Sequence, residues 1–168
     1  IGEQYRKGLM GRDSAGVKWK LDQNVVSQQF GQNSTTTVTA SVDTGTGAGF
    51  LTSGWASSSQ ITLTAANTGI FRLNAGDVIT IAGVYAVNPQ NRQPYGTNKL
   101  RNFVVKATTS ITSGSSGAVT VSPAVITAGQ FQNVSIPSPV SNASVTQFNS
   151  TGTVSAQNII MHRNAFTL

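Results

Sequence analysis

Residues 72–93 read RLNAGDVITIAGVYAVNPQNRQ, and this stretch decides the fold. Gly76 and Asp77 are typical turn residues, and we expect the Asp77 side chain to cap the backbone of its own turn. The apolar, β-branched run that follows, residues 78–87, predicts a strand, and we expect its residues 78–82 to lie in the protein core. A polar loop with one proline and one arginine begins at Asn88.

Similar strand patterns, separated by turn residues, continue on both sides of this stretch. Alternating or β-branched runs occur at TTTVTASV (35–42), QITLTA (60–65), NFVVKATTSI (102–111) and AVTVS (118–122). In QITLTA we expect Ile61 and Leu63 to face inward, and we expect TSGSSG to close a hairpin between the last two runs. AVITAG and QFQNVSI add further short strands. This regular spacing predicts an antiparallel sandwich or barrel.

The two ends of the chain have a different pattern. Residues 1–12 predict a short helix with Ile1, Tyr5 and Leu9 on one face, and VKWKLDQNVV (17–26) predicts a half-buried strand. The prolines of IPSPVSNAS (136–144) predict a loop, and AQNIIMHRNAFTL predicts a strand or a strand followed by a helix end. Because the chain starts without Met, we expect it to be a piece of a longer protein.

The composition is unusual in its low charge. Charged residues are 10% of the 168 residues, against roughly 25% in a typical soluble domain. Such a surface is weakly protected against association, which indicates a protein that sits against neighbours. The net charge is +6, and no acid follows Asp77, so Arg92, Lys99, Arg101 and Lys106 form an uncompensated basic cluster. We interpret these as solvated loop charges, since no aromatic stacking pattern accompanies them; a nucleic-acid or acidic partner is the alternative.

The sequence predicts no catalytic, metal or cofactor site. There is no cysteine, His162 is the only histidine, and the five acids are scattered. GTGAG (45–49) lacks the lysine and the following helix of a phosphate-binding loop. We expect Trp19 and Trp55 to be packing residues, and no window approaches the ~20 apolar residues of a membrane span. We therefore predict that the protein is not an enzyme.

Several motifs resemble a known family. LNAGDVITIAGVYAVNP, LRNFVVKA (100–107) and the closing NIIMHRNAFTL resemble the coat proteins of tailed bacteriophages. The similarity is to the branch, common in short-tailed phages, whose major capsid protein carries a β-barrel insertion domain. The opening IGEQYRKGLMGRDSAGVKWKLDQNV is similar to the helix, glycine turn and strand that lead into that insertion.

The resemblance implies a specific architecture. It is a mainly β, antiparallel barrel or sandwich insertion domain, attached to part of the axial domain of the Hong Kong phage type of capsid fold. Residues 1–34 would be an axial-domain piece, residues 35–127 the barrel, and residues 128–168 the return segment into the axial domain.

The resemblance also implies a function as a structural subunit of an icosahedral head, in the virion, assembled in the bacterial cytoplasm. The implied partners are other copies of the chain, a scaffolding protein, and packaged DNA only as a weak non-specific contact, with no membrane and no cofactor. The loop 88–98 is one candidate inter-subunit contact and DTGTGAGF (43–50) is another. The candidate contact residues are Asn88, Gln90, Arg92, Lys99 and Arg101. Because this chain has few acids, charge-paired contacts of the family are not carried over.

One alternative class stays open. A β-sandwich binding module of a phage tail, or a secreted carbohydrate-binding protein, would also explain the strands and the turn-rich loops. That function would need Trp19 and Trp55 exposed together on one face.

Overall fold

The computed structural model describes residues 24–32, 38–40, 50–51, 54–65, 70–96, 99–137, 143–148 and 152–158. These residues contain thirteen strands and no helix. The strands are β1 (Ser27–Gln29), β2 (Val38–Ala40), β3 (Phe50–Leu51), β4 (Ser59–Ala65), β5 (Ile70–Leu73), β6 (Val78–Ala86), β7 (Leu100–Val105), β8 (Thr109–Thr112), β9 (Ser116–Ser122), β10 (Val125–Ile126), β11 (Val134–Ser135), β12 (Ala143–Gln147) and β13 (Val154–Ala156). The helix expected over residues 1–12 lies outside the described residues, as does most of the strand expected over 17–26.

The chain divides into two compact units. One is Gln29–Val154, and the other combines Ile1–Gln28 with Ser155–Leu168. In the second unit only residues 24–28 and 155–158 are described, and there Gln157 donates a backbone hydrogen bond to Val26. The functional features below all belong to the unit Gln29–Val154.

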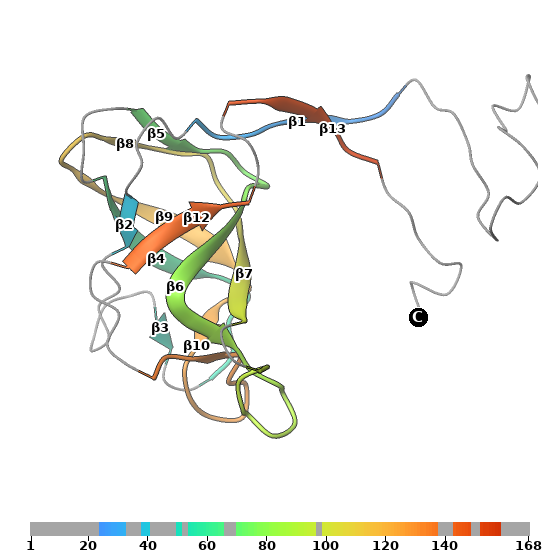
Figure 1. Cartoon of the computed structure of the whole chain (residues 1–168), viewed down its shortest axis with the longest axis vertical. Helices are drawn as coiled ribbons and strands as arrows, with labels where there is room; N and C mark the ends of the chain where they lie inside the picture. The colour runs from blue at the N-terminus through green and yellow to red at the C-terminus, as the bar shows by residue number, and fades with distance from the viewer. Residues whose placement is uncertain are drawn as a thin grey trace, which may run out of the picture. The chain divides into compact units, whose positions relative to one another are not determined.

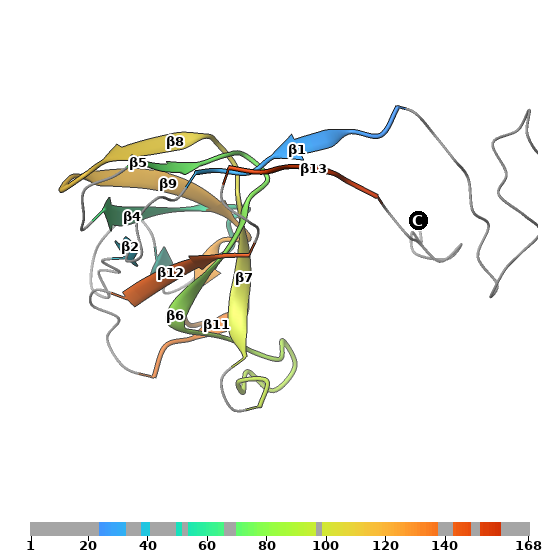
Figure 2. The same ribbon diagram turned by 45° about the horizontal axis from the view of Figure 1, so that its top comes forward.

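A closed antiparallel barrel forms the centre of this unit. Seven strands are hydrogen-bonded in the order β11-β6-β12-β2-β4-β9-β7, and a further pairing of β6 with β7 joins the sheet to itself. Six of the strands therefore form a closed ring, in the order β6, β12, β2, β4, β9 and β7. The curvature of these strands is visible in Figures 1 and 2. All pairings in the ring are antiparallel. The predicted mainly β, antiparallel fold is confirmed, and closure leaves the ring without free edges.

Alternation along the strands fills the barrel with apolar side chains. Ile61 and Leu63 of β4 are buried and alternate with exposed or half-buried residues, as predicted. Within residues 78–82 of β6 the buried residues are Ile79 and Ile81, whereas Val78 is half-buried and lies on the outer side. The stretch 78–82 therefore contributes alternate residues, not a continuous run, to the core.

We predicted one strand over residues 102–111, and this was wrong, because two strands form there. β7 ends at Val105, three exposed residues follow, and β8 then pairs with β5 through Thr109 and Leu73. The last two runs do pair antiparallel, as predicted, but through β7 and β9, whereas β8, which directly precedes the TSGSSG loop, pairs with β5. Buried Ile111 keeps the same alternation as Val105, so the side-chain pattern does not show that the chain changes sheets.

The barrel also extends beyond residue 127, where we expected it to end. β11 pairs with β6, and β12 lies between β6 and β2, so the ring cannot close without residues 143–147. β12 begins inside the loop expected over 136–144. Its sequence, ASVTQ, buries only Ala143 and Val145, which gives a weak hydrophobic signal. The assignment of the flanking segments to an axial domain stays a prediction.

A buried carboxylate joins the places where the chain enters and leaves the barrel. Asp77 has no exposed surface, and its Oδ2 accepts hydrogen bonds from the backbone N–H of Gly31 (3.0 Å) and Asn74 (2.8 Å) and from Nε2 of Gln147 (3.2 Å). Gly152 in turn donates its N–H to the carbonyl of Gly31 (2.9 Å). The predicted capping of the Asp77 turn is confirmed, and the same oxygen also binds residues 46 and 70 positions away in sequence. These residues are called the Asp77 junction below.

Candidate contact loop

The candidate loop lies between β6 and β7. The register of this strand pair shifts between Thr80 and Tyr85, where Gly83 adopts a φ of 82° and β6 bends. Beyond the bend, Val87 forms an isolated bridge with Pro94, and the residues between them make a closed loop. Figure 1 shows this loop as the green to yellow projection at the lower end of the barrel. Residues 88–96, called the contact loop below, are described by the structure.

Asparagine side chains hold the contact loop together from within. The backbone N–H of Gln93 lies 3.0 Å from Oδ1 of Asn91, and that of Gln90 lies 2.9 Å from Oδ1 of Asn88. The backbone adds bonds from Asn88 N–H to the Gln93 carbonyl (2.9 Å) and from Arg92 N–H to the Asn88 carbonyl (2.8 Å). Such Asx turns fix a loop without help from the rest of the fold. The contact loop is therefore exposed and yet ordered by its own residues.

The base of the loop is fixed to the barrel. Tyr95 donates its backbone N–H to the Ala86 carbonyl, and Ala86 donates its own to the Lys99 carbonyl, each at 2.9 Å. The Lys99 Nζ lies 5.5 Å from the centre of the Tyr95 ring, which is a cation–π distance. The sequence analysis found no aromatic stacking pattern beside the basic residues and did not foresee this single contact within the chain. A single tyrosine in a turn-rich segment has no periodic pattern that would have revealed it.

Arg92 holds the most unusual backbone conformation of the loop. Its φ is 56°, and no other residue except glycines has a positive φ in the described part of the chain. This left-handed conformation costs roughly 1–2 kcal/mol for a residue with a side chain. Arg92 is exposed, so burial of its side chain in the barrel does not hold it in this conformation. Backbone strain of this kind is often found where a loop binds a partner.

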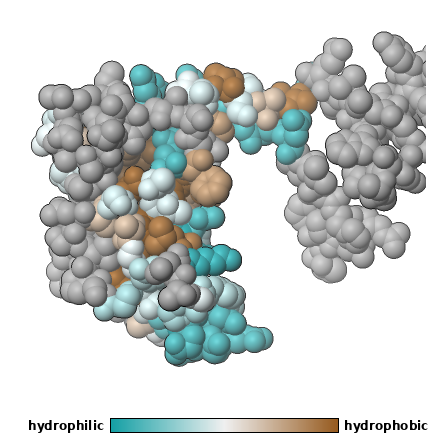
Figure 3. All heavy atoms as spheres, in the orientation of Figure 1, coloured by the Kyte–Doolittle hydropathy of each residue, from teal (hydrophilic) through white to brown (hydrophobic). Residues whose placement is uncertain are grey.

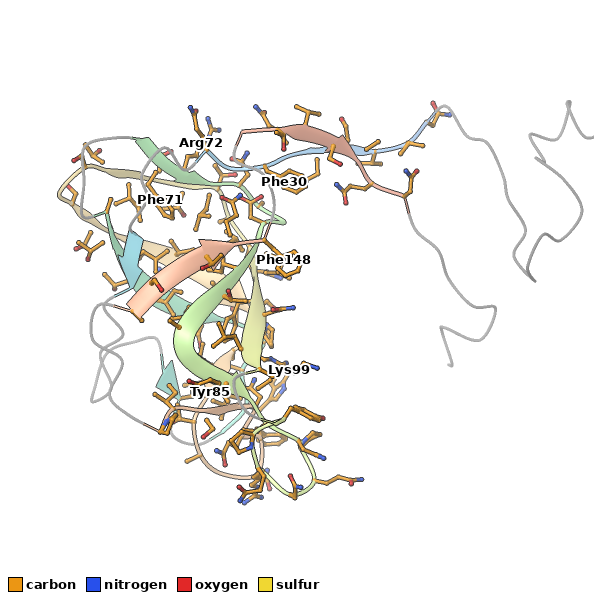
Figure 4. The ribbon with its side chains drawn as sticks, viewed as in Figure 1. Phe30, Phe71, Arg72, Tyr85, Lys99 and Phe148 are labelled. Atoms are coloured by element: carbon orange, nitrogen blue, oxygen red, sulfur yellow. The ribbon has the colours of Figure 1, made fainter. Side chains whose placement is uncertain are left out.

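The five candidate residues differ in their surroundings. Gln90, Arg92 and Lys99 are exposed, whereas Asn88 is half-buried and acts as an internal support of the loop. Arg101 is half-buried on β7 beside the bend of β6, and its Nε is buried without a hydrogen-bond partner. Figure 4 shows Lys99 at the loop end of β7.

The basic cluster predicted from the sequence does not form one patch. Lys106 follows the opposite end of β7 from Lys99. At ~3.3 Å per residue of extended chain, the two lysines are about 20 Å apart. The cations near the loop are therefore Arg92, Lys99 and Arg101 alone among the described residues.

The environment of Trp55 also differs from our prediction. We expected it to pack in the core, but it is 71% exposed. Its neighbours in sequence, Gly54 and the serines that follow, do not form a strand until Ser59. An apolar residue in such a short segment gives no sequence signal of the side it faces. Trp19 and His162 lie outside the described residues.

The described residues offer few of the groups that bind metals. Within them, no three histidine, cysteine, aspartate or glutamate side chains come together as metal ligands. Within the same residues, no helix is long and apolar enough to cross a membrane.

Comparisons with known proteins give one similar structure to report. No family model matches the sequence, and no curated protein matches it. A solved structure described as the CUS-3 coat protein I-domain is 23% identical, with a TM-score of 0.41. The match covers 70% of this chain and 100% of that chain. A likeness at this level does not establish a shared family.

Proposed function

We propose that this chain is part of a structural subunit of a bacteriophage capsid, and that it acts through contacts between subunits. The Asn88–Gly96 loop, with Lys99 and Arg101 beside it, docks on a neighbouring copy in the shell. The chain works in the virion after assembly in the bacterial cytoplasm. A scaffolding protein is a further partner during assembly, and packaged DNA makes only weak non-specific contact.

Two features of the molecule support this proposal. The resemblance to tailed-phage coat proteins rests on two motifs. LNAGDVITIAGVYAVNP contains the Asp77 turn, β6 and the start of the contact loop, and LRNFVVKA contains β7. The low charge of 10% suits a protein that is surrounded by copies of itself, because few charges must be paired when surfaces meet.

The observation that carries the proposal is the internal order of an exposed loop. A loop that is already ordered loses little conformational entropy on binding, which leaves more of the contact energy as affinity. The contact loop obtains this order from the side chains of Asn88 and Asn91 and from the Val87–Pro94 bridge. In a shell each subunit has several neighbours, so modest contacts add up to a stable particle.

Assembly of the protein, produced in the full length that its gene encodes, tests the proposal. We expect the wild-type protein to form closed particles or rings in electron micrographs and fast-sedimenting species in the ultracentrifuge. The variant Arg92→Glu/Lys99→Glu should reduce these species strongly, because it reverses the charge of the exposed loop without touching the core. Arg72→Glu is the matched control: Arg72 is an exposed cation on β5, away from the loop, and should leave assembly unchanged.

Three outcomes would contradict the proposal. The first is a full-length protein that stays monomeric at high concentration, and the second is turnover of a substrate by that monomer. The third is assembly that responds equally to the Arg72 and the loop variants, which would indicate a general effect of charge and not a contact at the loop.

A carbohydrate-binding module is the second candidate function, and the exposure of Trp55 favours it. An indole that is 71% exposed offers an apolar platform of the kind that stacks on sugar rings. Glycan titrations that quench tryptophan fluorescence in the wild type and not in Trp55→Ala would support this candidate. Absence of binding to a broad glycan panel would remove it.

A further inference from the structure

The Asp77 junction contains three buried side-chain oxygens that accept no hydrogen bond. They are Oδ1 of Asp77, Oδ1 of Asn74 and Oε1 of Gln147, and they are three of the four buried side-chain polar atoms without a partner in the described part of the chain. Asn74 and Gln147 each donate a hydrogen bond to Oδ2 of the same carboxylate, so the three oxygens belong to groups that meet at one place in the fold. Buried polar atoms without a partner are rare in proteins, and an ion is one explanation for them.

The hydrogen bonds of the two amide nitrogens fix the orientation of both amides. Nδ2 of Asn74 donates to the Gln29 carbonyl at 2.9 Å. Nε2 of Gln147 donates to Oδ2 of Asp77 at 3.2 Å and lies 3.5 Å from the Gly31 carbonyl. All these neighbours are acceptors, so turning either amide over would place an oxygen against another oxygen. The unpartnered atoms are therefore oxygens, which only a hydrogen-bond donor or a cation can satisfy.

The charge of Asp77 favours a cation over a neutral donor. Asp77 has no exposed surface, and its three hydrogen-bond donors are neutral N–H groups. Buried charges in proteins are usually paired with an opposite charge or coordinate a metal ion. A water molecule donates two hydrogen bonds and brings no charge, whereas a cation attracts every oxygen around it and balances the carboxylate.

We propose that the Asp77 junction binds a hard metal cation, and that this cation is Ca²⁺. Carboxylate and amide oxygens are typical ligands of Ca²⁺, which accepts irregular arrangements of oxygens, whereas Mg²⁺ requires a near-ideal octahedron and keeps several waters. The ligands are the oxygens of Asp77, Asn74 and Gln147 that accept no hydrogen bond. Because they include only one carboxylate, we expect weak binding, with a dissociation constant of about 1 mM. The sequence-based prediction of no metal site rested on acids, histidine and cysteine, and two amides from distant segments have no such motif.

The proposed site lies away from the contact loop. Figure 3 shows the hydrophilic side chains of that loop at the lower end of the barrel, whereas Asp77 directly precedes the opposite end of β6. Asn74 and Gln147 are half-buried, so the site lies close to the surface and a cation can reach it. Gln147 belongs to β12 and Asn74 to the turn before β6, and Oδ2 of the same carboxylate binds Gly31. A bound cation therefore stabilises the region where the chain enters and leaves the barrel.

Calorimetric titration of the 168-residue chain with CaCl₂ tests the inference, together with urea unfolding in the presence and absence of the salt. Choline chloride keeps the ionic strength constant. We expect saturable binding of one Ca²⁺ per chain. The equilibrium constant of unfolding should fall about tenfold when Ca²⁺ is about ten times above its dissociation constant. MgCl₂ at the same concentration should have a much smaller effect.

Two variants assign the binding to the junction. Asp77→Asn removes the charge and Oδ1 but keeps an acceptor for the three N–H groups, so the folded variant should lose the response to Ca²⁺. The response is a difference measured within each variant, so a change in its own stability does not affect the comparison. Gln147→Ala should weaken Ca²⁺ binding about tenfold or more. Gln60→Ala, which removes an exposed glutamine from β4, is the matched control and should leave binding unchanged.

Three results would overturn the inference. The first is a wild-type chain that shows no saturable binding of Ca²⁺. The second is a response that persists in Asp77→Asn or in Gln147→Ala, which would place the ion on the acids outside the described residues, Glu3, Asp13, Asp22 and Asp43. The third is an equal response to CaCl₂ and MgCl₂, or a response to NaCl alone, which would exclude a calcium site. Because particle assembly is tested with Arg92 and Lys99, failure here leaves the proposed function intact, and the reverse also holds.

Discussion

The Asp77 junction and the contact loop solve the same problem, that of ordering an irregular backbone, in opposite ways. At the junction one buried carboxylate collects N–H groups from residues far apart in sequence. In the contact loop, the side chains of half-buried Asn88 and exposed Asn91 accept hydrogen bonds from backbone groups two residues away. The junction therefore exists only in the folded barrel, whereas the loop obtains its order locally.

This difference indicates that the junction contributes to the stability of the fold, whereas the contact loop serves to bind a partner. Hydrogen bonds to a buried charge are stronger than exposed ones, and their loss leaves unpaired donors inside the protein. Local bonds in an exposed loop can exchange with water at little cost. We expect substitutions at the junction to change the free energy of unfolding, and substitutions in the loop to change its order and its contacts with little effect on unfolding.

Removal of the junction carboxylate should have the largest effect. Asp77→Ala leaves the N–H groups of Gly31, Asn74 and Gln147 without their acceptor, so we expect a loss of about 3 kcal/mol in unfolding free energy, measured by urea denaturation. Oδ1 of Asp77 has no hydrogen-bond partner, and neither have the buried side-chain oxygens of Asn74 and Gln147.

Asp77→Asn is therefore the informative companion of Asp77→Ala. Its carbonyl oxygen replaces Oδ2 as the acceptor, and its NH₂ group replaces Oδ1, which accepts no hydrogen bond in the wild type. We expect it to lose only about 1 kcal/mol. Equal losses in the Ala and Asn variants would show that the charge matters more than the hydrogen bonds.

Gly31→Ala tests how closely the backbone packs at the same junction. An added Cβ would meet the Arg72 carbonyl oxygen, Oδ2 of Asp77 at 2.7 Å and Cα of Leu73 at 2.8 Å. Two of these are backbone atoms of β5 and cannot move cheaply, so we expect a loss of about 2–3 kcal/mol. Gly117→Ala is the comparison, because the three atoms nearest to its added Cβ all belong to the Ile111 side chain, the closest at 2.7 Å, and a side chain moves at less cost than backbone. A smaller loss at Gly31 than at Gly117 would contradict the close packing of the junction.

The sequence predicted the barrel well where strands are long and alternating. β4 and β6 were found because Ile61, Leu63, Ile79 and Ile81 repeat with period two. β12 was missed since it is short and buries only small side chains, and its place in the ring depends on pairing with distant β2 and β6. Propensity and alternation contain no information on which strands pair.

The candidate site was predictable only in its position. Proline, asparagine and arginine marked residues 88–98 as an exposed loop, but the sequence did not show that Asn88 and Asn91 order it or that Tyr95 lies under Lys99. The reach of Asp77 to Gly31 and Gln147 depends on tertiary folding and has no local signal. Phe148, Val78 and Val104 likewise become neighbours only through the register of β6 and β7 and the end of β12.

Asn88→Ala should reduce the order of the contact loop with little effect on the stability of the protein. The variant removes the acceptor of the Gln90 N–H in an exposed position, so we expect a loss of at most about 1 kcal/mol in unfolding free energy. Amide exchange of Gln90 and its neighbours in the loop should nevertheless become much faster. A loss as large as that of Asp77→Ala would show that the loop contributes to the barrel and would end the distinction between the two regions.

Arg92→Gly should have the smallest effect on stability, and of the opposite sign. Glycine adopts the φ of 56° without steric cost, whereas its greater freedom in the unfolded chain offsets part of this gain. We therefore expect a stabilisation of a few tenths up to about 1 kcal/mol, measured as a higher urea midpoint. Gln90→Gly, in the same loop but outside the left-handed region, should instead be neutral or slightly destabilising. A stabilised Arg92→Gly protein that assembles poorly would show that the Arg92 side chain makes an inter-subunit contact despite its backbone strain. Unchanged assembly would show that Arg92 is not part of the contact.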